Sequence, residues 1–185
     1  MTTQLTKLQM IQLAMGHLGK GINALSDLGP VEDYVSLMYD IRLEAALADN
    51  FWGFANKTQE LSRLPGEYIN PDWKYTFQLP SDYLTANKVF ETFPYIIEGR
   101  YLMANSQDVT LDYRYLPSNA LFRADFIEYF TTSLAADLAL PIAEKAEYIQ
   151  VLTLRAEKAR ERAVSSSAKA APNRPFRLNP MIAVR

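Results

Sequence analysis

The stretch from Trp73 to Leu84 reads WKYTFQLPSDYL and decides how the rest of the chain is interpreted. Its first half alternates large apolar residues with polar ones, the apolar members being Trp73, Tyr75, Phe77 and Leu79. A period of two predicts a half-buried β-strand. Pro80 should end the pairing of this strand, and Asp82 is expected to cap the turn that follows. An edge strand of a small sheet is therefore predicted here.

Further short strands are predicted on both sides of a hairpin. The segment 88–92 is one candidate, and 109–116, VTLDYRYL, alternates again. Between them, YIIEGRYLM places a Glu98-Gly99 turn between two apolar runs, which is typical of a β-hairpin. Three or four antiparallel strands are therefore expected within a strand-rich insertion at residues 51–116.

The flanking sequence carries the three- and four-residue spacing of helices. Four helices are predicted, at residues 3–18, 31–50, 123–140 and 142–163. Pro141 is expected to interrupt the third helix and to begin the fourth. In the second helix one apolar face is predicted, consisting of Val31, Tyr34, Val35, Met38, Ile41, Ala45 and Ala48. Leu37, Leu43 and Leu47 lie off that face, so contacts on two sides are expected.

These elements predict an α+β fold that is mainly α. A helical bundle would carry a small antiparallel β-sheet, inserted between an N-terminal and a C-terminal pair of helices. The bundle and sheet would form one domain at residues 1–164, followed by a basic, proline-containing extension at 165–185. With 185 residues the chain is long enough to bury a core of its own.

The composition excludes several classes of function. There are no cysteines, which excludes disulfides, thiol nucleophiles and thiolate metal sites. The single histidine, His17, could be a general base or a residue that favours a helix C-terminus. The pairs Asp125/Glu128 and Glu144/Glu147 could bind a divalent ion or belong to solvated helix faces. Without a phosphate loop or hydrolase motif, we expect no enzyme and no cofactor.

No apolar run approaches the roughly 20 residues that a membrane helix needs, and no signal peptide is expected. Charge is segregated along the chain, since residues 155–185 carry +6 and the preceding 154 residues carry −8. The basic extension could bind nucleic-acid phosphate, enter a groove of a protein partner, or remain a solvated end. Spaced apolar and basic residues favour the partner, with anchors at Arg174, Phe176, Arg177, Leu178, Met181, Ile182 and Arg185.

Aromatic residues make up 12% of the chain and are concentrated in the strand region. The conspicuous ones are Trp73, Tyr75, Tyr83, Tyr95, Tyr101, Tyr113 and Tyr115. They could stack on single-stranded nucleic acid, form a protein–protein interface, or simply pack a small sheet against helices. The region is not basic, which argues against nucleic acid.

Five stretches in a fixed order resemble a known family. They are YDIRLEAALADNFWGFA (39–55), WKYTFQLPSDYL (73–84), YIIEGRYLMAN (95–105), LDYRY (111–115) and FIEYFTTSLAADLA (126–139). Together they resemble the head-to-tail connector, or adaptor, proteins of tailed bacteriophages, of the tail tubular protein A type. The resemblance spans about Leu5 to Ala163.

The resemblance implies a structural virion protein. Such adaptors form a ring, typically of about twelve subunits, beneath the portal protein after genome packaging. They carry the tail or nozzle protein, and phage DNA contacts the channel only in passing. The extension would bind the portal, and the seven aromatic residues would meet neighbouring subunits or the tail. The protein would assemble in the host cytoplasm and reside in the neck of the virion, away from membranes.

Two other classes of function stay open. One is a DNA-associated helical module that uses the basic C-terminal helix and extension. Its DNA affinity would fall steeply with salt. The other is a metal-dependent enzyme built from Asp and Glu alone, whose stability would respond to a particular divalent ion.

Overall fold

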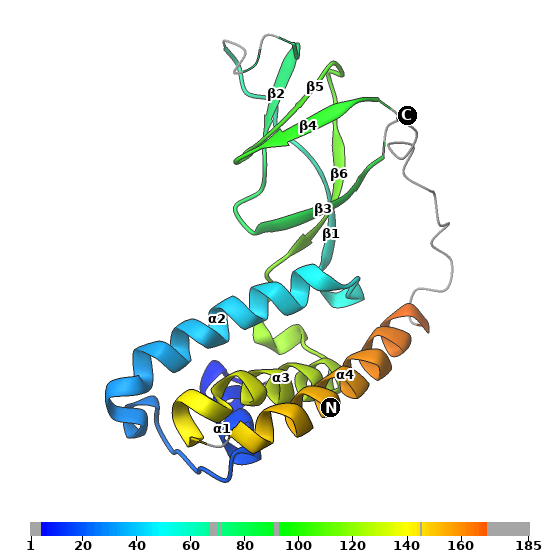
Figure 1. Cartoon of the computed structure of the whole chain (residues 1–185). Coiled ribbons are helices and arrows are strands. Elements are labelled where there is room, and N and C mark those ends of the chain that lie inside the picture. The colour runs from blue at the N-terminus through cyan, green and yellow to red at the C-terminus, as the bar shows by residue number, and fades with distance from the viewer. Residues whose placement is uncertain (1–4, 67–69, 71, 91–92, 145, 170–185) are drawn as a thin grey trace.

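The computed structural model describes residues 5–66, 70, 72–90, 93–144 and 146–169 (Figure 1). Within these residues, helices gather at one end of the molecule and strands at the other. Each part has its own hydrophobic core. The predicted fold class, α+β with helix predominating and strands inserted between two helix pairs, is confirmed.

The helical part contains four α-helices and three short 3₁₀ helices among the described residues. The α-helices are α1 (Lys7–His17), α2 (Glu32–Asp49), α3 (Ala124–Ala143) and α4 (Ala146–Lys169). The 3₁₀ helices are η1 (Leu25–Val31), η2 (Gly53–Ala55) and η3 (Asn119–Leu121). Helix α1 begins later than predicted because Thr6 caps it: its Oγ1 accepts from the Gln9 amide at 3.2 Å, while Gln9 Oε1 accepts from the Thr6 amide at 2.9 Å.

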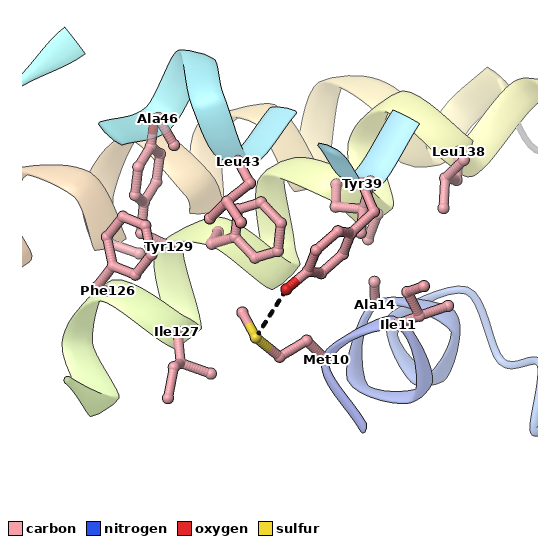
Figure 2. Close-up of a cluster of buried hydrophobic side chains, with 14 of the residues drawn as sticks. Met10, Ile11, Ala14, Tyr39, Leu43, Ala46, Phe126, Ile127, Tyr129 and Leu138 are labelled. Carbon is pink, nitrogen blue, oxygen red and sulfur yellow. Dashed lines mark hydrogen bonds between the residues drawn. The ribbon is translucent and has the colours of Figure 1, made fainter. Parts of the chain in front are cut away.

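Helix α3 lies at the centre of the helical core. Its buried positions lie all round the helix, as expected for a helix packed on several sides. Tyr39 of α2 packs against α3, where its ring meets the ring of Phe130 edge-on at 5.1 Å. The Tyr39 hydroxyl donates to Met10 Sδ at 3.3 Å (Figure 2). It also accepts from the Asn119 side-chain amide at 3.1 Å. Burial raises the pKa of Tyr39 to about 12.

Helix α2 turns a different face to the core from the one predicted. Its buried residues are Val35, Tyr39, Leu43, Ala46 and Leu47. Of the predicted apolar face, only Val35 is buried, whereas Tyr34 and Ile41 are exposed. The error arises because α2 has apolar residues on two opposite sides, so periodicity alone cannot tell which side meets α3.

The boundary between α3 and α4 also differs from the prediction. Pro141 lies inside α3, where it neither ends that helix nor begins the next. The break comes at Glu144, whose φ of 56° and ψ of 28° place it in the left-handed region, and whose amide bonds to the Leu140 carbonyl at 3.1 Å. Helix α4 then runs to Lys169, so residues 165–169 are helical and do not belong to an extended tail.

The strands form two three-stranded antiparallel sheets, where one small sheet was predicted. The strands are β1 (Asn56–Glu60), β2 (Tyr75–Gln78), β3 (Tyr83–Val89), β4 (Tyr95–Glu98), β5 (Tyr101–Ala104) and β6 (Thr110–Tyr115). One sheet has the order β1-β6-β3 and the other β2-β5-β4. The predicted hairpin is confirmed as β4 and β5, which turn at Gly99 with a φ of 58°. Strand β1, NKTQE, was not predicted because all of its residues are polar.

The first half of the Trp73–Leu84 stretch forms an edge strand, β2, as predicted. Strand β2 pairs with β5 on one side, and its Phe77 is fully buried in the strand core. Its other side is partly covered, since the Leu64 amide donates to the Thr76 carbonyl at 2.9 Å. The turn after Pro80 closes with the Tyr83 amide on the Pro80 carbonyl at 3.2 Å.

Helices and strands are joined where the C-terminal end of α2 meets the β1-β6-β3 sheet. Trp52 is buried in the helical core and donates from Nε1 to the Ala46 carbonyl at 2.8 Å. From the strand side, the Arg114 guanidinium donates to the Ala48 carbonyl, and the Tyr115 hydroxyl donates to the Phe54 carbonyl at 3.3 Å. These bonds tie the C-terminal end of α2 and the η2 segment to β6.

Candidate interaction surfaces

The seven aromatic residues predicted for an interface pack mainly inside the strand part. Tyr113 is only 1% exposed and belongs to the strand core, so we no longer assign it to an interface. The other six are partly buried: Trp73, Tyr75, Tyr83, Tyr95, Tyr101 and Tyr115. These keep some surface for a partner, and whether they meet one stays a prediction.

Two of these aromatic residues, Tyr113 and Tyr115, take part in a cluster with Lys57 and Asp82 inside the strand part. The Lys57 ammonium lies 3.8 Å from the centre of the Tyr115 ring and 2.6 Å from Asp82 Oδ2. Tyr113 donates its hydroxyl to Asp82 Oδ1 at 3.1 Å. Burial acts to raise the pKa of Asp82, but the hydrogen bonds from Lys57 and Tyr113 outweigh it and leave the pKa below its usual value. The Asp82 side chain therefore joins β1 to β6, where the sequence predicts a turn cap.

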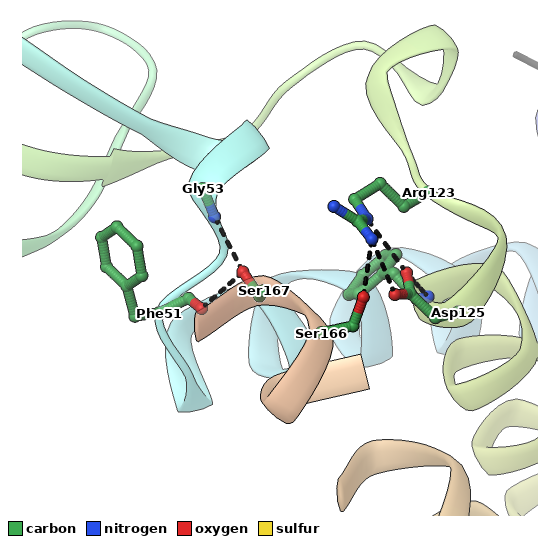
Figure 3. Close-up of polar contacts among 7 residues, drawn as sticks. Phe51, Gly53, Arg123, Asp125, Ser166 and Ser167 are labelled. Atoms are coloured by element: carbon green, nitrogen blue, oxygen red, sulfur yellow. Dashed lines mark hydrogen bonds and ion pairs between the residues drawn. The ribbon is translucent and has the colours of Figure 1, made fainter. Parts of the chain in front are cut away.

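The predicted portal-binding residues of the extension lie outside the described residues. They are Arg174, Phe176, Arg177, Leu178, Met181, Ile182 and Arg185. The structure does describe the point at which the extension leaves the domain. Ser167 Oγ accepts from the Gly53 amide at 3.2 Å and donates to the Phe51 carbonyl at 3.3 Å (Figure 3). Nearby, Arg123 donates to Ser166 Oγ at 2.7 Å, so the last turn of α4 is held at the junction with the strands.

An exposed apolar surface runs along α2 on the side opposite its core face. We call it the α2 outer face, and its members are Tyr34, Leu37, Ile41, Ala45 and Ala48. Leu37 is 57% exposed and Ile41 53% exposed. A single exposed leucine is ordinary, but a continuous apolar row on one helix marks an interaction site.

A second region of exposed apolar residues lies where α3 ends and α4 begins, and its α4 members point to more than one side of that helix. We call it the α3–α4 corner, and its members are Leu140, Tyr148, Ile149, Val151 and Leu154. Val151 is 66% exposed and Leu154 52% exposed. Both α2 and α4 pack against α3 through their buried faces, so their exposed faces point away from the centre of the bundle. The two apolar surfaces are thus distinct.

As whole helices α2 and α4 differ in net charge, although the α3–α4 corner itself carries two acids, Glu144 and Glu147. Helix α2 has five acidic side chains and one basic one, a net charge of −4, whereas α4 has three acidic and five basic ones, a net charge of +2. Asp33 and Glu44 lie one turn from Leu37 and Ile41, and form no ion pair with any described residue. Arg155 and Lys158 each lie one turn beyond an exposed apolar residue of α4 and are likewise free of ion pairs within the described residues.

An open hollow adjoins the α2 outer face near its C-terminal end. Its volume is about 420 Å³, and it is lined by Arg42, Ala45, Ala46, Ala48, Asp49 and Tyr129. Arg42 is paired with Asp137, and Asp49 lies 2.6 Å from Arg160, so the charged members of the lining are neutralised. Small alanines beside projecting leucine and isoleucine give this face the relief that receives a large side chain from a partner.

The residues considered for catalysis or metal binding include His17 on α1 and the pair Asp125 and Glu128 on α3. His17 is half-buried at the end of α1; burial lowers its pKa, Arg155 lowers it further, and Glu128 opposes both. Asp125 pairs with Arg123 at 3.2 Å and Glu128 with Arg162 at 3.1 Å, so these two carboxylates lie in ion pairs. Among the described residues, no group of three or more His, Asp or Glu side chains could hold a metal ion.

Sequence reasoning overlooked the two apolar surfaces as candidate sites, although a signal for one was present. Leucines on both sides of α2 indicated that this helix has contacts on two sides.

In the part of the chain that the structure describes, no helix has the length and apolar character needed to cross a membrane. No protein-family model matches the chain, and no curated protein matches it. Its function must therefore be inferred from the surfaces it presents.

Proposed function

We propose that this chain is a structural subunit of a bacteriophage virion, a ring-forming head-to-tail adaptor. It would bind beneath the portal protein after genome packaging, carry the tail or nozzle protein, and let DNA pass through its channel. The observation that supports this most is the presence of separate surfaces on one small domain. The α2 outer face and the α3–α4 corner lie on different helices whose buried faces both pack on α3, as a subunit with a neighbour on each side requires.

The remaining surfaces fit the two other partners of such a subunit. Four of the partly exposed aromatic residues, Trp73, Tyr75, Tyr95 and Tyr101, lie in or beside the β2-β5-β4 sheet, which is the sheet further from the helices and where a tail or nozzle protein would bind. The extension leaves α4 at the junction and carries three arginines and four large apolar residues without an acid, which suits a groove on the portal. None of these roles needs catalysis or a cofactor.

Binding to the portal ring of the same virus tests this proposal. We expect the full chain to bind the portal, and a chain that ends at Lys169 to keep its fold but lose most of the binding. A chain that ends at Lys169 keeps the Ser166 and Ser167 contacts, so circular dichroism should match that of the full chain. Full portal binding by the shortened chain would remove the role of the extension. Failure of the full chain to bind the portal would overturn the adaptor proposal.

A second candidate, a DNA-associated module, is favoured by one specific observation. Four exposed basic residues recur on one side of α4, namely Arg155, Lys158, Arg162 and Lys169. Such a row can follow a phosphate backbone. If it does, the affinity for duplex DNA falls linearly with salt on logarithmic axes, and reversing the charge of Lys158 lowers the slope by about one unit. An affinity that is absent at moderate salt would exclude this candidate.

A further inference from the structure

We propose that the strand part is a hinged unit, and that Arg114 of β6 is the latch that fixes its angle to the helical part. The proposal goes beyond the adaptor role and does not depend on it. Among the apolar side chains of the described strands, only Leu84 packs against the helical core. No apolar side chain of the described α-helices packs in the strand core. Two parts that share so little apolar contact move relative to each other unless polar contacts hold them.

The pivot of this hinge lies where the chain crosses between the two parts. It crosses twice, at residues 50–55 and 116–123, near the C-terminal end of α2 (Figure 1). On the helical side the crossings are clamped together, because the rings of Phe54 and Phe122 meet edge to face with 5.8 Å between their centres. On the strand side of this ring pair, Leu116 is 42% exposed. The pivot is therefore placed on the strand side of the ring pair.

The side chain of Arg114 reaches across the pivot. Its guanidinium donates to the carbonyl of Ala48, in the last turn of α2, where backbone carbonyls lack a partner within the helix. The helix dipole favours a cation at this end, and a contact of this kind biases a two-state equilibrium about two- to thirtyfold. Arg114 Nε is buried without a hydrogen-bond partner among the described residues, so opening the latch returns this donor to water. The contact is thus strong enough to set the angle and weak enough to release.

The neighbouring residue on β6 adds a second bond across the pivot. The Tyr115 hydroxyl donates to the Phe54 carbonyl at 3.3 Å. Arg114 and Tyr115 therefore both end on backbone carbonyls of the helical side, and β6 is the strand that carries the latch. Because this strand lies at the centre of the β1-β6-β3 sheet, a change in its angle moves the whole sheet.

Release of the latch would let the two sheets tilt together, since they share one strand core. The β2-β5-β4 sheet lies further from the pivot and moves through the larger arc (Figure 1). Its partly exposed aromatic residues would then be presented to a partner over a range of angles.

Distances between pairs of spin labels test the latch, because the natural chain has no cysteine to compete for the label. Phe90→Cys on the strand part and Val151→Cys on α4 are 49% and 66% exposed and span the junction. In the full chain, double electron–electron resonance should give one narrow distance distribution for this pair. Arg114→Met, which keeps much of the stem but removes the charge, should raise the open population about two- to thirtyfold and broaden the distribution. Arg114→Lys keeps the charge and should give an intermediate result.

A matched control pair lies within the helical part. Leu37→Cys with Val151→Cys joins α2 to α4, and its distance distribution should be the same with Arg114 and with Arg114→Met. This pair separates release of the hinge from a general loss of fold.

Three outcomes would overturn the proposal. The first is an unchanged distribution across the junction in Arg114→Met, which would mean that packing alone fixes the angle. The second is an equal broadening of the control pair, which would mean that the substitution loosens the helical part itself. The third is a broad distribution across the junction while Arg114 is still present, which would mean that no latch holds the strand part.

Discussion

Two leucines on helix α2 should lose very different amounts of stability on substitution by alanine. Leu43 is 5% exposed and belongs to the helical core, whereas Leu37 is 57% exposed and belongs to the α2 outer face. Leu43→Ala leaves a cavity between α2 and α3, and buried leucine-to-alanine changes cost about 2–5 kcal/mol. Leu37→Ala removes a side chain from the surface, where changes stay within about 0.5 kcal/mol.

Urea denaturation of the dilute chain, followed by far-ultraviolet circular dichroism, measures both effects. A loss of about 3 kcal/mol corresponds to a fall in Tm of roughly 6–12 °C for a chain of this size. Both variants remove the same atoms from the same helix, so differences in helix propensity cancel. A Leu37→Ala variant destabilised as much as Leu43→Ala would refute the assignment of the outer face.

Two further predictions concern single residues of the helical part. Glu144→Gly should raise the free energy of unfolding by about 0.5–1 kcal/mol in urea denaturation, because a φ of 56° strains a residue with a Cβ; an unchanged or lower value would count against the left-handed cap. Because the folded-state pKa of Tyr39 is raised from about 10 to about 12, its contribution to stability is full below pH 10 and is lost as the pH rises to 12. We expect the loss over that interval to be smaller in Tyr39→Phe by at most about 2–3 kcal/mol, the remainder coming from other tyrosines with a raised pKa such as Tyr113, and tyrosinate absorbance with alkaline denaturation measures it.

The sequence predicts the local elements well where one period dominates. Strands β2 and β6 alternate apolar and polar residues, and the apolar runs of β4 and β5 flank the Glu98-Gly99 turn; each of the four was expected within a residue or two of its bounds. Strand β1 has no apolar residue and is held to β6 by backbone pairing and by polar side chains such as Asn56 and Lys57, so hydrophobic periodicity carries no sign of it. The split into two sheets depends on which strands pair, and a period of two does not encode this.

The helix errors have a similar origin. A proline in the last turn of a helix, such as Pro141, is compatible with helix when its neighbours satisfy the freed carbonyl, so the true break at Glu144 depends on tertiary packing. Helix α2 carries apolar residues on two sides, and only the position of α3 decides which side becomes core. The candidate surfaces were overlooked for the same reason, since exposure is a property of the fold.

The most direct test of the adaptor account is the solution mass of the purified chain, alone and mixed with the portal ring of its own virus. The account predicts a chain of 21.0 kDa that joins the portal as a ring of about twelve copies, with the mass of the complex rising accordingly. A chain that leaves the mass of the portal unchanged and instead binds duplex DNA at moderate salt would contradict it.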